Sequence, residues 1–169
     1  MKNKINKIAW ASLLTCGMML VGCNTPEKEA GSLKDAYKGH FLIGAAVNVD
    51  QSEGRDTAGG RGVKEHFNSI TAENCMKSMY LQPAEGDFFF DEADKFIEFG
   101  EANGMHIVGH TLVWHSQAPD WFFTDDEGND VTRDVLIERM RNHIRTVVER
   151  YKGRVHGWDV VNEAILDDG

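Results

Sequence analysis

The chain has 169 residues, of which 41% are hydrophobic and 27% are charged, and its formal net charge at pH 7 is −9. These proportions are those of an ordinary globular protein. Because an acidic surface repels phosphate groups, we expect neither nucleic acid nor an anionic lipid surface as a partner.

Residues 1–22 have the pattern of an export signal. Three lysines within the first seven residues precede an apolar run over residues 8–21, which is too short to span a bilayer stably. The ending Leu-Val-Gly-Cys resembles the bacterial lipoprotein signal, which implies lipidation of Cys23. The chain would then be exported and anchored by lipid to the bacterial cell envelope, at the outer membrane or the cell surface. The alternative is an ordinary secretory signal with a chance cysteine.

The composition changes again after the signal. Residues 23–37 are polar and contain Pro26 and Gly31, which predicts a flexible tether between the lipid and a folded domain over residues 38–169. With Cys23 lipidated, Cys75 has no partner for an intrachain disulfide. We therefore expect Cys75 to be a small buried apolar side chain.

Strands and helices alternate along the predicted domain. Apolar runs at 41–47, 69–72 and 106–114, and a fourth within 157–164, predict strands, the first of them buried on both faces. A Gly-rich loop over 50–62 and a short helix to Phe67 separate the first two strands. Asp91 predicts the N-cap of a helix that Gly104 stops, and Thr132 predicts the cap of a longer helix that ends at Gly153.

This order requires parallel strands joined by crossover helices, which both a doubly wound sheet and a barrel provide. No Gly-rich nucleotide-binding loop follows the first strand. Polar residues follow every strand instead: Asn48, Glu73-Asn74, His115-Ser116-Gln117 and Asn162-Glu163. A rim of this kind favours a (β/α)8 TIM barrel, of which this chain holds about the first four β/α units.

Three blocks carry a family resemblance: Thr71 to Lys77, Gly109 to Gln117 and Trp158 to Ala164. In this order they resemble the signatures of the glycoside hydrolase family 10 xylanases, over residues 38–169. The resemblance implies an endo-acting hydrolase of β-1,4-xylan that retains anomeric configuration and needs no cofactor. Its expected partners are xylan and xylo-oligosaccharides.

The resemblance also implies roles for individual residues. Glu163 would be the general acid/base, and Asn162 would hold the sugar 2-hydroxyl. The nucleophile, a second glutamate, is expected outside this chain, so that residues 23–169 alone would be inactive. A half barrel also leaves its first and fourth strands unpaired, which predicts poor solubility. Six further positions match family residues that line the subsites on the glycone side of the cleaved bond: Glu73, Asn74, Lys77, His110, Trp114 and Gln117.

Other interpretations remain open at this stage. Lys77 could be a solvated lysine and Trp114 a core residue, whereas Asp159 is expected to be a structural partner. A zinc site is disfavoured, because His106 and His110 share a strand face that His115 does not. Ser78 stands where relatives often carry a tryptophan near the glycone wall. The functional alternatives are a truncated, non-catalytic xylan-binding lipoprotein and another retaining β-1,4-glycanase.

Overall fold

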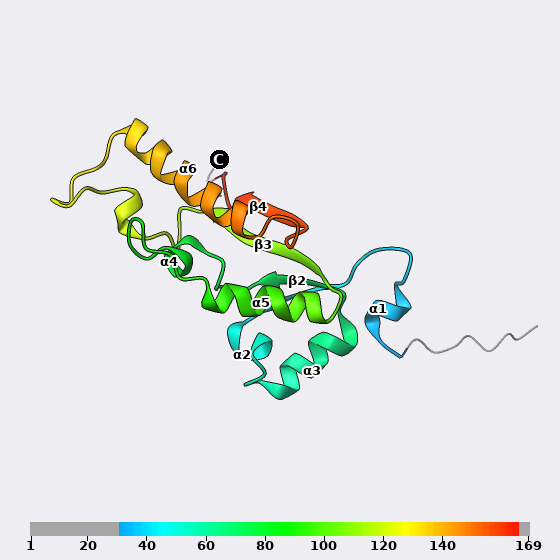
Figure 1. Ribbon diagram of the computed structural model, residues 1–169. Helices are drawn as coiled ribbons and strands as arrows, with labels where there is room; N and C mark the ends of the chain where they lie inside the picture. Colours follow the sequence, from blue (N-terminus) through cyan, green and yellow to red (C-terminus); the bar gives the residue numbers. More distant parts are fainter. Residues whose placement is uncertain (1–30, 166–169) are drawn as a thin grey trace, which may run out of the picture.

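The computed structural model describes residues 31–165, so the predicted signal, Cys23 and most of the predicted tether lie outside the described residues. Four parallel strands form one sheet in the order β1-β2-β3-β4, as predicted (Figure 1). Their bounds are β1 Gly44–Val47, β2 Ser69–Ala72, β3 His106–Val113 and β4 Gly157–Val161.

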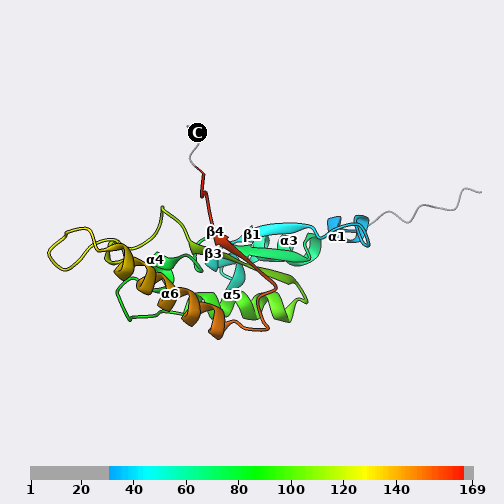
Figure 2. The ribbon, with the colours of Figure 1, turned by 90° about the horizontal axis from the view of Figure 1, so that it is seen from above.

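Helices connect each strand to the next. Their bounds are α1 Leu33–Ala36, α2 Val49–Ser52, α3 Thr57–His66, α4 Ser78–Leu81, α5 Asp91–Ala102, the 3-10 helix η1 Asp120–Phe122, and α6 Arg133–Arg150. The two long helices α5 and α6 lie on the same side of the sheet (Figure 2). None of the helices within residues 31–165 is long and apolar enough to cross a membrane.

The core lies between α5 and the central strands. Phe96 and Ile97 form the packing face of α5, and both are fully buried. Gly100 completes this face, and a Cβ there would lie 2.6 Å from Cδ1 of Ile107, so only glycine allows helix and sheet to approach this closely. Cys75 is also buried, as predicted, and burial raises the pKa of its thiol to about 12.

Helix caps explain where the sequence predictions were wrong. The predicted loop at 50–62 contains α2 and most of α3, because Asn48 forms a capping box with Gln51 and the Asp56 side chain caps α3. Similarly, Ser32 caps α1 inside the predicted tether. Phe90, not Asp91, is the N-cap of α5, whereas Thr132 caps α6 as predicted.

The outer strands are more exposed than predicted. The first apolar run was expected to be buried on both faces, yet Phe41 is 58% exposed and Leu42 51% exposed. In β4, Val160 and Val161 are 55% and 54% exposed. Within residues 31–165, β1 and β4 are the two edges of the sheet, so nothing described covers their outer sides.

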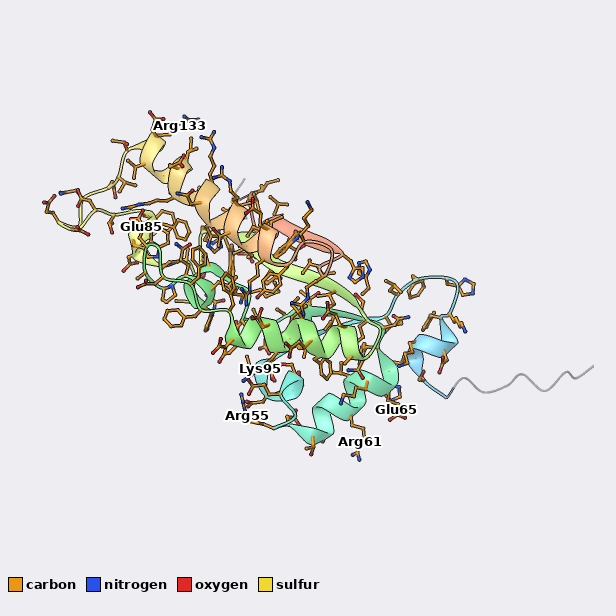
Figure 3. The ribbon with its side chains drawn as sticks, in the orientation of Figure 1. Arg55, Arg61, Glu65, Glu85, Lys95 and Arg133 are labelled. Carbon is orange, nitrogen blue, oxygen red and sulfur yellow. The ribbon has the colours of Figure 1, made fainter. Side chains whose placement is uncertain are left out.

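A charged group fixes α2 against α5. The Glu53 side chain, which follows α2, accepts from Nζ of Lys95 on α5 at 2.7 Å and also pairs with Arg55. Arg55 and Lys95 lie close together beside these helices (Figure 3). The Glu53 carboxylate is largely buried, so this pairing is less screened than an ordinary surface ion pair. The segment after β1 is therefore held in place.

Candidate active site

The predicted site residues follow the carboxyl ends of the strands, except for His110, which lies within β3, and these ends meet at one edge of the sheet. The backbone N–H of Glu73, after β2, donates to the carbonyl of Val47 in β1 at 3.0 Å. The N–H of Asn162, after β4, donates to the carbonyl of Val113 in β3 at 2.9 Å. Polar side chains from separate segments are thus brought to a common rim.

Lys77 is the centre of a polar network. Its side chain is buried, and Nζ donates to Oδ1 of Asn74 at 2.9 Å and to Oε1 of Gln117 at 2.6 Å. The ammonium also lies 5.0 Å from the ring centroid of Trp114, within range of a cation–π interaction. A buried lysine with two amide acceptors is not a solvated surface residue, so the alternative interpretation of Lys77 is wrong.

Gln117 connects this network to α4. Its backbone has φ +48°, an uncommon value for a residue other than glycine, and its carbonyl accepts from the N–H of Met79. Its Nε2 lies 3.5 Å from both Oδ1 of Asn74 and the hydroxyl of Tyr80. Within residues 31–165, Glu163 is the other non-glycine residue with positive φ, at +49°. Such conformations often occur at functional sites.

The side chain of Glu163 is held by Trp114. The indole Nε1–H donates to Oε2 of Glu163 at 2.7 Å, and Nε2 of His115 lies 3.8 Å from the same oxygen. Trp114 is therefore not a simple core residue. The Glu163 side chain is 57% exposed, so it can be reached by a ligand.

Asp159 orients His110, as the predicted structural role requires. Oδ2 of Asp159 lies 2.9 Å from Nδ1 of His110, and its backbone carbonyl accepts from the hydroxyl of Thr111 at 2.8 Å. This contact engages Nδ1 and leaves Nε2 of His110 for a ligand.

Two cavities, each of about 340 Å³, flank these residues. The first, which we call the acidic pocket, is lined by Asn48, Val49, Asp50, Glu73, Asn74, Tyr80 and Glu92. The second is mainly apolar and lies among β3, β4, η1 and α6, with Trp114 and Glu163 on its wall. Ser78 is buried and lines this apolar cavity, and the aromatic side chain that lines the acidic pocket is Tyr80.

A buried network supports the loop between β3 and α6. The Trp121 indole N–H donates to the carbonyl of Gln82 at 2.9 Å and so anchors this loop. Oε1 of Gln82 lies 2.9 Å from Nδ1 of His143 on α6. Burial lowers the pKa of His143 to about 4, so this imidazole is neutral at pH 7.

The sequence prediction missed Tyr80, Glu92 and His143. Tyr80 lies three residues after Lys77, a spacing that places side chains on neighbouring parts of a helix, and it could have been found this way. His143 fits the apolar stripe of α6 between Met140 and Val147. Glu92 carried no such signal, because it reaches the pocket through the packing of α5.

His106 and His156 lie side by side at the opposite end of the sheet, with ring centroids 4.6 Å apart and the rings tilted by 33°. Within residues 31–165, no group of three or more His, Cys, Asp or Glu side chains is arranged to hold a metal ion.

Comparison with known proteins shows what this chain resembles. The chain is 47% identical over 153 residues to endo-1,4-beta-xylanase A of Xylanibacter ruminicola, covering 90% of this chain and 42% of that protein. An endo-1,4-beta-xylanase structure from Caldicellulosiruptor owensensis matches with a TM-score of 0.74 and 51% identity, over 82% of this chain and 41% of that one. A mutant structure in complex with xylotriose matches with a TM-score of 0.75 and 43% identity, over 82% and 41%.

This chain thus spans less than half the length of these relatives. Its four strands are the first four strands of a (β/α)8 barrel. The model of the family described as glycosyl hydrolase family 10 matches residues 32–169. The chain therefore belongs to glycosyl hydrolase family 10.

Proposed function

We propose that this chain is the N-terminal half of the catalytic domain of an endo-1,4-β-xylanase, which hydrolyses the β-1,4-xylosidic bonds of xylan with retention of configuration. The observation that carries the proposal is Glu163, an accessible carboxylate at the end of β4 whose Oε2 accepts the Trp114 N–H. Relatives 47% and 49% identical to this chain are named endo-1,4-beta-xylanases.

Glu163 serves as the general acid/base. In the first step it protonates the glycosidic oxygen, and in the second it deprotonates the water that releases the sugar. Because an N–H group already faces Oε2, a proton on that oxygen would oppose the donor, so the transferable proton belongs on Oε1. Trp114 therefore determines which oxygen of the carboxylate performs the chemistry.

Retention requires a second carboxylate, about 5–5.5 Å from the first, that acts as nucleophile. We propose that this group comes from a part of the catalytic domain outside this chain. We assign the acidic pocket to the sugars on the glycone side and call it the glycone pocket from here on. Glu73 is a carboxylate of the described site, but it follows β2 and lines this pocket. It is assigned to substrate binding.

Polar groups of mixed character suit an uncharged polyol such as xylan. The Lys77 ammonium and the amides of Asn74 and Gln117 offer donors and acceptors to sugar hydroxyls, and Trp114 offers an aromatic face. Asn162, beside Glu163, is assigned to the sugar 2-hydroxyl, where a hydrogen bond strengthens in the transition state. One related structure is a complex with xylotriose, which supports a xylo-oligosaccharide as the ligand.

We also propose that the mature protein is exported and anchored through lipid on Cys23, on the basis of the sequence pattern alone. Replacing Cys23 with Ser in cells fed a radioactive fatty acid would test this. The wild-type protein should carry label and sediment with membranes, and the variant should do neither. Label on both proteins, or on neither, would contradict the proposal.

The activity itself is tested on the full-length gene product that contains residues 32–169. We expect release of reducing sugar from xylan and little from carboxymethyl cellulose. The reverse preference would favour another β-1,4-glycanase. Xylo-oligosaccharide binding without cleavage, unchanged by Glu163→Gln, would favour a non-catalytic binding protein.

A further inference from the structure

Tyr80 lies where the glycone pocket meets the Lys77 network. It belongs to α4, its side chain is 41% exposed, and it lines the pocket together with Glu73 and Asn74. Its hydroxyl lies 3.5 Å from Nε2 of Gln117, whose Oε1 accepts from Lys77. One side chain thus contacts both the pocket and the residues assigned to hydrogen bonding.

The glycone pocket is lined mainly by polar residues, and Val49 and Tyr80 are its two less polar side chains. Among the described residues that line it, Tyr80 alone is aromatic, and carboxylate or amide groups predominate. A pyranose ring has hydroxyls around its edge and C–H groups on its faces. Carboxylates and amides can bind the edge, whereas an aromatic ring can pack on a face.

The pocket walls are held before any ligand arrives. On one side, the ion pair of Glu53 with Lys95 fixes the segment that carries Asp50. On the other, α4 is joined to the loop after β3 by the hydrogen bond from the Met79 N–H to the Gln117 carbonyl. A preformed wall loses little conformational entropy when a ligand binds.

We infer that Tyr80 is a specificity-determining residue: its ring packs against an uncharged pyranose ring that occupies the glycone pocket, and its hydroxyl steadies Gln117. The inference rests on the proposed xylanase function for the identity of the sugar. The carboxylates of Asp50, Glu73 and Glu92 around the same pocket favour an uncharged ring over an acidic one.

The test compares nitrophenyl β-xyloside with nitrophenyl β-xylobioside on the full-length gene product, because the second substrate adds one sugar ring on the glycone side. Tyr80→Ala should lower kcat/KM for the xylobioside about five- to tenfold and change the xyloside by less than about twofold. Tyr80→Phe, which keeps the ring, should retain most of the preference. Met79→Ala is the matched control, since Met79 is 38% exposed on the same helix and lines neither cavity.

Xylotriose binding to the same variants in a Glu163→Gln background, measured by calorimetry, tests the pocket wall without turnover. Weaker binding by Tyr80→Ala, with Tyr80→Phe and Met79→Ala close to wild type, would support the inference even if the wild-type protein cleaved neither substrate. A wild-type protein that cleaved neither substrate would refute the proposed hydrolysis but not the role of Tyr80 in binding. Equal losses on both aryl substrates, unchanged xylotriose binding in Tyr80→Ala, or an equal effect of Met79→Ala would overturn the role of Tyr80.

Discussion

The indole N–H of Trp114 donates to Oε2 of Glu163 at 2.7 Å, and this bond joins the residue after β3 to the second residue after β4. The two residues are 49 positions apart in the chain. Their contact depends on the parallel pairing of β3 with β4, in which Val113 lies opposite Val161. The position of the proposed acid/base is therefore a property of the sheet and of a neighbouring side chain.

Replacing Trp114 with Phe in the full-length gene product should lower kcat on xylan about ten- to one hundredfold, because a hydrogen bond to a charged group is lost. Trp121→Phe is the control, since its N–H donates to the Gln82 carbonyl away from the carboxylate. It should lower Tm and change kcat by less than about threefold, as expected of a neutral bond outside the site. Equal effects of the two changes on kcat would show that Trp114 only supports the fold.

Lys77→Met should lower kcat/KM on xylo-oligosaccharides by about ten- to one hundredfold, because Asn74 and Gln117 lose their shared donor and no longer present fixed groups to the sugar. Steady-state kinetics would measure this, and Tm would report the fold. Lys152→Met, at an exposed position after α6, should leave kcat/KM within about twofold. A fully active Lys77→Met enzyme would contradict the assigned role.

Asp94 should make stability depend on acid pH. Burial acts to raise the pKa of Asp94, but hydrogen bonds from Arg150 and Tyr151 outweigh it and hold the pKa below its usual value. Its stabilisation is therefore present above the unfolded-state pKa and lost as pH falls through the lower folded-state pKa. Asp94→Asn should cost about 1–3 kcal/mol at pH 7 and much less at an acid pH below the folded-state pKa of Asp94.

Denaturant unfolding of the full-length protein at both pH values would measure this difference. Glu98→Gln, an exposed change on the same helix, should show little effect at either pH. A cost for Asp94→Asn that is the same at both pH values would mean that ionisation of Asp94 is not its source.

His143 should also make stability depend on pH, because its uncharged form is the one that the fold favours. Burial lowers its pKa to about 4, so between that pH and about 6.5 the unfolded chain binds a proton that the folded chain does not. Stability should fall by up to about 3 kcal/mol as pH decreases through this range. His143→Phe should remove that decrease, whereas His40→Phe, at an exposed position, should retain it.

Local sequence patterns were sufficient for much of the fold. The β2 prediction at 69–72 has the observed bounds, and the β3 prediction ends within one residue of Val113. The helical segment after β1 was missed because side-chain caps at Asn48 and Asp56 outweigh its glycines. The exposure of β4 could not be predicted, because burial depends on which elements lie beside a strand.

Only part of the candidate site could be predicted from the sequence. The parallel order of strands brought Glu73, Lys77 and Glu163 to one rim because consecutive carboxyl ends must meet there. Lys77 pairs with Gln117, and Glu92 lines the glycone pocket. Both placements depend on how loops and helices pack, which the spacing of residues in the sequence does not encode. For Tyr80, the spacing of three residues from Lys77 was visible in the sequence, but its contacts with the pocket and with Gln117 were not.

The most direct test of Glu163 as acid/base uses Glu163→Gln in the full-length gene product, with an aryl xylobioside whose leaving group departs without protonation. The glycosyl-enzyme should still form but hydrolyse slowly, because the general base is absent. Added azide should then restore turnover and yield the β-xylobiosyl azide, formed with retention. No rescue by azide, or an α-configured azide product, would contradict the assignment of Glu163 as acid/base.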